Sequence, residues 1–221
     1  MIVDPKDSRT KDIYKLMIGS ITPRPIAFVS SRSSGGVNNL APYSFFTGVS
    51  VNPPAIGFSP LVNFEGRLKD SRINIEECGE FVVNIVSEDL VEKMNSCAVD
   101  VPPTVDEFNI SCLTPVASDV VGVPRVKEAR VSMECKLLEL VEISKIKMGG
   151  AFIIGEVVRF HVDDSVVEDF RINPKLLATV GRMGGNTYCR TKDLFEMERP
   201  DLEQTMNLLK QQREKPILGR E

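Results

Sequence analysis

Residues 23–46 read PRPIAFVSSRSSGGVNNLAPYSFF. The apolar and serine-rich segment 25–31 predicts a strand, and the glycine pair at 35–36 supplies a turn. Segment 37–51 predicts a returning strand that is interrupted at Pro42. This returning segment is rich in amide, hydroxyl and aromatic side chains. Two interpretations are open: a plain hairpin with its aromatic side chains in a core, or a hairpin whose loop also lines a binding site.

The rest of the chain adds more strands than helices. Strands are predicted over 54–60, 80–87, 129–143 and 149–164, and helices over 10–17, 69–79, 87–98 and 201–215. The helix at 69–79 is expected to be capped by Asp70 or Ser71 and to end at Gly79. Because regular strand–helix–strand alternation is rare, the pattern predicts a mainly β fold, a β-barrel with flanking helices, and not a doubly wound sheet.

The domain organisation follows from what the sequence lacks. We find no internal repeat and no low-complexity linker, so residues 1–221 are predicted to form a single domain. The segment 200–221 is predicted to be a C-terminal helical tail. Its apolar stripe is thin, which is typical of a helix that packs on its own domain or on a partner subunit.

Composition excludes several functional classes. The net charge is −4, from 27 basic and 31 acidic residues, and no segment concentrates basic residues, so nucleic-acid binding is not expected. No apolar run approaches the ~18 residues of a membrane span, and residues 1–12 lack a secretory signal. The five cysteines are widely spaced without a C-x-x-C pair. They indicate reduced, mostly buried thiols in a cytoplasmic protein.

Hydrolytic and nucleotide-triphosphate chemistry are also disfavoured. His161 is the sole histidine, so neither a Ser-His-Asp triad nor a histidine-based metal site can be assembled. The glycine-rich motifs of dinucleotide and triphosphate binding are absent as well. What remains is chemistry whose reactive centre belongs to a bound cofactor.

Three segments place polar groups where loops leave strands. Lys69, Asp70 and Ser71 open a helix, where backbone amides, a hydroxyl and an ammonium favour a phosphate. Taken alone, the segment favours the plainer interpretation, in which Asp70 and Ser71 are ordinary caps and Lys69 is a surface charge. The loop 40–46 could present free backbone amides to a ligand around Pro42, or bury its aromatic residues in the core. Segment 181–190 could carry Tyr188 as an aromatic lid, or be a glycine turn.

Taken together, these segments resemble the flavin reductase-like family. The matching stretches are PRPIAFVSS, GGVNNLAPYSFFTGVSVNPPAIGFS, KDSRINI, GEFVVNIVSEDL, VDEF, PRVKEARVSMECKL and IGEVVRFHVDD, in the order in which the family has them, over about residues 19–199. The family has the FMN-binding split-barrel fold, and its members are typically homodimers with noncovalent FMN near the subunit interface. Ser71 stands where the family more often has threonine, and the segment before Lys69 is longer than usual.

The resemblance implies a set of cofactor-binding positions. Arg24 and Pro25 belong to the strand beside the flavin, and the ring would be lined by Asn39, Ala41, Pro42, Tyr43, Ser44 and Phe45. Ser59, Lys69, Asp70 and Ser71 match the phosphate and ribityl side, and Arg182 and Tyr188 match a later glycine-rich segment. No residue is assigned a catalytic role as proton donor.

The implied function is that of an NAD(P)H-dependent flavin reductase. Bound FMN would take a hydride from NAD(P)H and pass electrons to free flavin, oxygen or a partner protein such as a monooxygenase. The alternative is a flavoredoxin-like electron carrier that does not oxidise NAD(P)H. A third interpretation is a split barrel that has lost its cofactor and serves as a structural partner.

Overall fold

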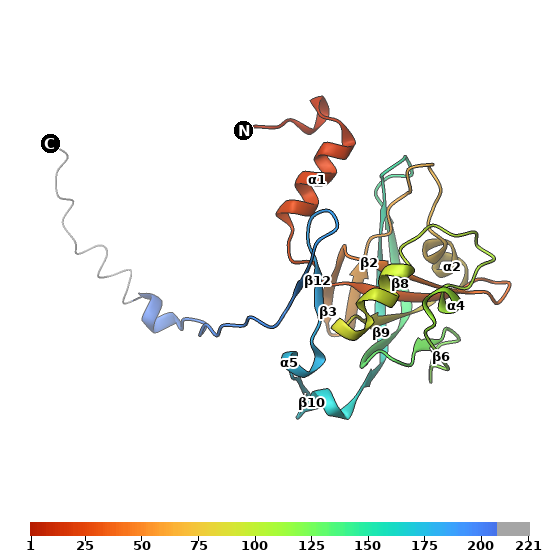
Figure 1. Ribbon diagram of the computed structural model, residues 1–221. Helices are drawn as coiled ribbons and strands as arrows, with labels where there is room; N and C mark the ends of the chain where they lie inside the picture. Colours follow the sequence, from red (N-terminus) through yellow and green to blue (C-terminus); the bar gives the residue numbers. More distant parts are fainter. Residues whose placement is uncertain (207–221) are drawn as a thin grey trace.

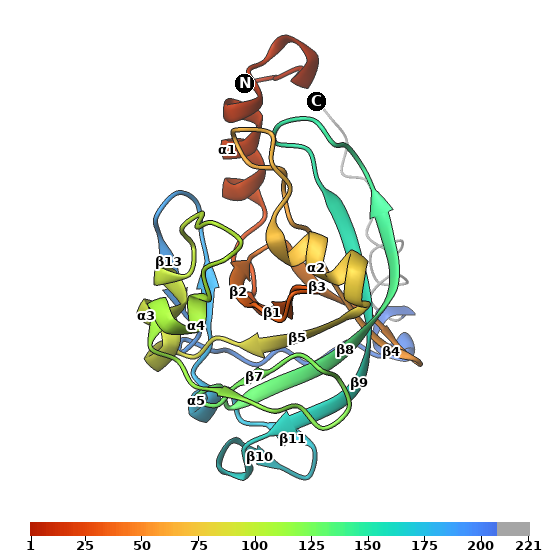
Figure 2. The ribbon, with the colours of Figure 1, turned by 90° about the vertical axis from the view of Figure 1, so that its right-hand side faces the viewer.

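A computed structural model describes residues 1–206 of the chain (Figure 1). The main sheet has seven strands in the order β2-β1-β5-β8-β9-β4-β3, with every neighbouring pair antiparallel. Its strands are β1 (Ala27–Arg32), β2 (Asn38–Tyr43), β3 (Phe46–Val51), β4 (Pro54–Phe58), β5 (Glu80–Ile85), β8 (Val131–Glu142) and β9 (Ala151–Val162). Figure 2 shows β8 and β9 curving around the shorter strands.

Helices and small two-stranded ribbons surround this sheet. The helices are α1 (Thr10–Ser20), α2 (Asp70–Cys78), α3 (Val91–Ser96), α4 (Glu107–Ser111) and α5 (Pro174–Leu177), with 3-10 turns η1 (Pro5–Asp7), η2 (Glu88–Leu90) and η3 (Asp164–Val166). The ribbons pair β6 (Pro115–Val116) with β7 (Arg125–Val126), β10 (Val167–Glu168) with β11 (Arg171–Ile172), and β12 (Val180–Arg182) with β13 (Tyr188–Arg190). In the described residues, no helix has the length and apolar character needed to cross a membrane.

The sheet curls until its two edges meet at one short link. β2 and β3 are consecutive in the chain yet form opposite edges, and only Ser44 and Phe45 separate them. No ladder joins β2 to β3, and the gap is bridged by side chains: the Tyr43 ring lies 5.0 Å from the ring of Phe58 on β4. The barrel is thus closed by packing at this line, and by hydrogen bonds elsewhere.

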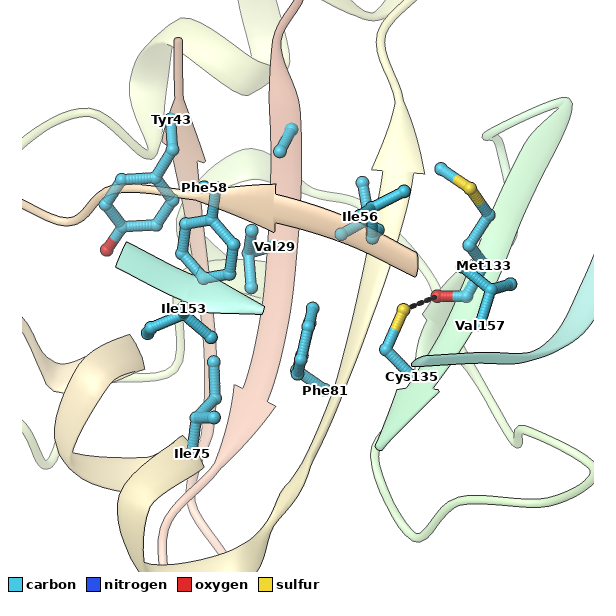
Figure 3. Close-up of a cluster of buried hydrophobic side chains, with 12 residues drawn as sticks. Val29, Tyr43, Ile56, Phe58, Ile75, Phe81, Met133, Cys135, Ile153 and Val157 are labelled. Atoms are coloured by element: carbon cyan, nitrogen blue, oxygen red, sulfur yellow. Dashed lines mark hydrogen bonds between the residues drawn. The ribbon is translucent and has the colours of Figure 1, made fainter. Parts of the chain in front are cut away.

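Alternation along the strands divides the apolar side chains between two cores. On β1, Ala27 and Val29 point into the barrel, whereas Phe28 points to the layer formed by α3, α4 and β12. The barrel core is drawn in Figure 3, where the Phe58 and Phe81 rings lie 5.6 Å apart. Because both faces of β1 are covered, its residues 27–31 are fully buried. Its sequence accordingly lacks the alternation of apolar and polar residues found in a strand with one exposed face.

Several local predictions need correction. Pro42 does not interrupt the return segment: it pairs with Phe28 within β2, and an edge strand tolerates its missing N–H. The predicted helix 87–98 is split into η2 and α3, and segment 101–116 contains the short helix α4. Among the cysteines only Cys97 and Cys135 are buried, so the expectation of mostly buried thiols is wrong.

The predicted helical tail is only partly within the described chain. Residues 202–206 are helical, and 207–221 lie outside the described residues. The division into a single domain over 1–221 remains a prediction.

Candidate functional site

A pocket of about 90 Å³ opens between β2, the loop before α2, the first turn of α2 and the segment after α3. Six of the predicted binding residues line it: Asn39, Ala41, Pro42, Tyr43, Lys69 and Asp70. The remaining lining residues are Asn63, Arg67, Leu68, Cys97, Ala98, Val99, Asp100, Val101 and Glu107. The structure therefore brings the polar groups of the 39–43 strand and of the 69–70 segment to one place.

The first turn of α2 forms one wall of this pocket. Lys69 is the N-cap residue and makes no side-chain cap, so the expectation that Asp70 or Ser71 caps the helix is wrong. Instead, the Asp70 carboxylate receives two hydrogen bonds from the Arg67 guanidinium, at 2.6 and 2.7 Å, while Lys69 bonds to Asp100. Gly79 ends the helix with a left-handed φ of 70°, as predicted. The positive end of α2 is thus left without a side-chain cap beside two cations.

Ser71 lies behind the pocket wall. It is 1% exposed, and its hydroxyl oxygen accepts hydrogen bonds from Asn39 Nδ2 at 2.8 Å and from the Tyr43 hydroxyl at 3.0 Å. Burial raises the pKa of Tyr43, which keeps its hydroxyl protonated and donating. Ser71 therefore fixes the orientation of two lining side chains from behind.

Two acidic residues of the pocket were not anticipated. Glu107 is 4% exposed and its Oε2 accepts the Leu40 amide at 3.0 Å; burial raises its pKa, and the nearby carboxylates of Asp70 and Asp106 add to the effect. For Asp100, burial opposes ionisation, but the hydrogen bond and charge of Lys69, a hydrogen bond from Asn63 and the charge of Arg67 together outweigh it and lower the pKa. The two cations of the pocket thus form ion pairs, Arg67 with Asp70 and Lys69 with Asp100.

Arg24 forms a second cluster with a structural role. Its guanidinium is 4% exposed and donates to the carbonyls of Ile18, Ile21 and Met183, at 2.6, 2.6 and 2.8 Å. Its Nε reaches Ser44 Oγ at 3.3 Å. These bonds tie the end of α1 to the β12–β13 ribbon and to the link between β2 and β3.

The other predicted positions surround this cluster. Phe45 lies with its ring centre 6.0 Å from the Arg24 guanidinium, and its carbonyl accepts the Ser59 amide at 2.8 Å. Pro25 lines a separate cavity of about 340 Å³ with Arg24 and apolar neighbours. Of the predicted binding residues, then, Arg24, Pro25, Ser44, Phe45 and Ser59 do not line the first pocket.

Arg182 and Tyr188 face each other across the β12–β13 ribbon. The Arg182 guanidinium lies 4.4 Å from the Tyr188 ring centre and donates to the Gly185 carbonyl at 2.6 Å. The Tyr188 hydroxyl donates to Asn95 Oδ1 at 3.1 Å. Neither residue lines the first pocket, although backbone hydrogen bonds of 3.0 and 2.8 Å join Arg182 to Arg24.

Sequence reasoning missed four polar lining residues: Asn63, Arg67, Asp100 and Glu107. Asn63 and Arg67 belong to the long segment before Lys69, whose unusual length was the available signal. Asp100 and Glu107 come from the proline-rich region 101–116 and its edge, where no regular pattern indicated which side chains would turn inward.

The sole histidine belongs to a separate polar cluster on the outer face of β8. Ligand-type atoms of Asp119, Glu134 and His161 lie within 4.8 Å of one another. Glu134 is fully buried, and its two oxygens accept the backbone amides of residues 119–121 at 2.7–3.0 Å and contact His161 Nε2 at 2.5 Å. With both oxygens engaged, the carboxylate anchors the loop over β8.

Comparisons with known proteins agree with this architecture. A family model described as "Flavin reductase like domain" matches residues 18–183. The crystal structure of nitrilotriacetate monooxygenase component B from Bacillus cereus is 40% identical, with a TM-score of 0.85 over 89% of this chain and 98% of that one. Pseudomonas fluorescens 2-nitrobenzoate 2-nitroreductase is 31% identical, with a TM-score of 0.81 over 91% and 98%.

A more distant structure shares the fold alone. Flavoredoxin of Desulfovibrio vulgaris is 20% identical, with a TM-score of 0.68 over 89% of this chain and 97% of that one. The seven-stranded barrel closed at a two-residue link and the match over residues 18–183 lead to one conclusion. The chain belongs to the flavin reductase-like domain family and has its split-barrel fold.

Proposed function

We propose that the protein is an NAD(P)H-dependent flavin reductase that binds FMN noncovalently. The observation that carries the proposal is the uncapped N-terminus of α2, which faces a pocket that also contains Lys69 and Arg67. Bound FMN supplies the hydride-accepting ring, which the side chains of this chain do not provide. Family membership and the similarity to a monooxygenase component support the same assignment.

The pocket residues fit the phosphate and ribityl parts of such a cofactor. Lys69, which contacts Asp100, would hold the phosphate, while Asn39 and Tyr43 are held in place by Ser71. The volume of about 90 Å³ is below the roughly 300–1,000 Å³ of pockets that enclose a whole small molecule. The ring system would therefore extend beyond it, from Ala41 and Pro42 toward the Ser44–Phe45 link.

In this proposal, several of the remaining predicted residues hold the Ser44–Phe45 link in position. Arg24 orients Ser44 and the ring of Phe45, and Ser59 fixes the Phe45 carbonyl. Pro25, Arg182 and Tyr188 border the same side of the molecule and would contact the more exposed part of the flavin.

We further propose that the chain is a single domain that works as a homodimer. β3 is an edge strand that pairs with β4 on one side only, and all its residues after Phe46 are exposed, including Val49 and Val51. Native proteins rarely leave such an edge uncovered. A second copy placed there would also shield the flavin ring. Light scattering during size-exclusion chromatography tests the dimer, and Val51→Lys should shift it toward monomer.

Anaerobic mixing of the flavin-loaded protein with NADH or NADPH tests the activity. Loss of the visible absorbance of oxidised flavin at a rate that saturates with nucleotide is expected. A protein that retains its flavin but is not reduced by either nucleotide would instead be an electron carrier. A protein that takes up no FMN would contradict both functions.

The phosphate position can be tested with charge variants. Lys69→Ala removes a charge-assisted contact and should weaken FMN binding by about 2 kcal/mol, or roughly 30-fold. Asp100→Asn releases Lys69 from its partner and should strengthen binding by up to about 1 kcal/mol. Lys136→Ala, an exposed lysine on β8, is the control. Equal FMN affinity in all three variants would show that the phosphate lies elsewhere.

The physiological acceptor follows from the same proposal. The Bacillus cereus structure is of a monooxygenase component, and we infer that reduced flavin from this protein likewise serves a separate monooxygenase. Stimulation of a candidate monooxygenase by this protein with NAD(P)H and catalytic amounts of free flavin would support that role.

A further inference from the structure

A second cavity, of about 430 Å³, lies at the end of the barrel where α1 begins. It is bounded by the first turn of α1, the loop before α2 and the tip of the β8–β9 hairpin, which approach one another at one end of the molecule (Figure 2). Its lining residues are Arg9, Thr10, Lys11, Asp12, Lys15, Phe64, Lys147 and Met148. No predicted cofactor-binding residue is among them.

The lining of this cavity is strongly cationic. It contains four basic side chains and one acidic side chain, in a chain whose net charge is −4. Asp12 is already held by Arg9 at 2.6 Å and by Lys15 at 3.1 Å. Within residues 1–206, neither Lys11 nor Lys147 has a carboxylate at salt-bridge distance. A concentration of uncompensated positive charge in a concave site attracts anions.

Both unpaired lysines approach the same aromatic ring. The ammonium groups of Lys11 and Lys147 lie 5.3 and 5.9 Å from the centre of the Phe64 ring, which is 46% exposed. Each contact is favourable on its own. However, bringing two like charges to one ring carries a repulsive cost that a bound anion would remove.

The exposure of Phe64 is imposed by a closed turn. Asn63 Oδ1 accepts the amides of Glu65 and Arg67, at 3.1 and 2.8 Å, and Gly66 has a φ of 88°. The Val62 amide donates to the Gly149 carbonyl at 2.8 Å, which fastens this turn to the hairpin that carries Lys147. Backbone hydrogen bonds therefore hold together the two segments that carry the Phe64 ring and Lys147.

We propose that this cavity binds a phosphomonoester attached to a planar aromatic base. Lys11 and Lys147 receive the phosphate, and the base packs against the exposed part of the Phe64 ring. The volume is within the roughly 300–1,000 Å³ range of small-molecule sites. Two sources share this chemistry: a free mononucleotide, including a second flavin mononucleotide, and the phosphorylated ribose of a dinucleotide.

This site is distinct from the flavin pocket but shares a turn with it. Asn63 and Arg67 line the first pocket, whereas Phe64 lines the second. A ligand stacked on Phe64 thus lies on the other side of the same turn. The inference does not rest on the proposed reductase activity, since binding can be measured without any reaction.

Calorimetric titration of the FMN-saturated protein tests the site, with 2′-AMP, 5′-AMP, FMN and adenosine as probes. Saturable binding of the phosphorylated probes, and weaker binding of adenosine, is expected. Preference for 2′-AMP would assign a dinucleotide as the source, and preference for FMN or 5′-AMP a free mononucleotide. Affinity should fall with increasing salt, because the contact is electrostatic.

Variants then locate the binding. Lys11→Ala combined with Lys147→Ala should weaken the preferred probe at least about tenfold, the effect of losing one charge-assisted contact. Phe64→Leu should weaken the nucleotide while leaving the weak binding of inorganic phosphate unchanged. Lys145→Ala, an exposed lysine of the same hairpin that pairs with Glu142, is the matched control. Absence of saturable binding up to roughly 10 mM, or equal affinity in the double variant and the control, would overturn the proposal.

Discussion

Glu107 and Glu134 are both almost completely buried, at 4% and 0% exposure, yet their pKa values move in opposite directions. Burial disfavours the charged form of both. At Glu134, hydrogen bonds from the Asp119 amide and from His161 outweigh burial and lower the pKa to about 2. At Glu107, burial outweighs the hydrogen bonds from the Leu40 amide and from its own backbone amide, and the pKa is raised.

The difference shows that the number of hydrogen-bond donors around a buried carboxylate, and not its degree of burial, sets the direction of its pKa shift in this protein. Glu134 is surrounded by three backbone amides and an imidazole, so it is a permanent anion that holds a loop. Glu107 stands beside Asp70 and Asp106 with few donors, so burial and these like charges raise its pKa. The first carboxylate belongs to the scaffold, and the second to the candidate site.

Glu134→Gln should produce the largest change in stability. It removes the charge that four donors surround, which should lower the free energy of unfolding by roughly 3 kcal/mol. Because the folded pKa lies below the ordinary value of 4.5, this stabilisation is complete above about pH 4.5 and is lost as the pH falls toward 2. Urea unfolding between pH 2.5 and 7 should therefore show a flatter acid limb in the variant. An unchanged acid limb would contradict the assignment.

His161→Ala should give a smaller effect of the same sign. It leaves the three amides in place and removes one donor, so a loss of about 1 kcal/mol is expected. The pKa of Glu134 should rise toward its ordinary value, which moves the acid limb of the stability profile to higher pH. The same urea titrations measure both quantities. A loss equal to that of Glu134→Gln would mean that the histidine, and not the amides, holds the carboxylate.

Glu107→Gln should have the smallest effect on stability, and of opposite sign. Since the pKa of Glu107 is raised in the folded protein, its stabilising contribution is complete below pH 4.5. That contribution is lost as the pH rises through the pKa of the folded state. The variant keeps an acceptor for the Leu40 amide without the charge, so it should be at least as stable as the parent at pH 8. It should also bind FMN more tightly at that pH. Destabilisation at pH 8 that matches Glu134→Gln would erase the contrast between the two carboxylates.

The barrel was predictable from the sequence because its strands carry strong patterns. The predicted strands 25–31, 129–143 and 149–164 correspond to β1, β8 and β9 of the main sheet, and the glycine pair lies in the turn between β1 and β2. The short elements escaped prediction, since α4, α5 and the two-residue strands are fixed by contacts with the rest of the molecule and not by local periodicity.

The candidate site was predictable only in part. Asn39, Tyr43, Lys69 and Asp70 do meet at one pocket, as the motifs indicated. The partners of Lys69 and Arg67 could not be foreseen, because Asp100 reaches Lys69 across 31 residues of chain. The expected cap at Asp70 failed for a local reason: Arg67 Nη2 donates to both oxygens of the Asp70 carboxylate and so competes with the helix amides.

The link between β2 and β3 has a mechanical consequence. A single cut between Ser44 and Phe45 would leave every strand ladder intact, yet it would free the two sheet edges to splay apart. Opening along that line would break no ladder hydrogen bond, whereas separating any two paired strands would. A flat ligand bound against the link would hold the two sheet edges together. Amide hydrogen exchange in β2 and β3 should therefore slow in proportion to the fraction of protein that carries the ligand.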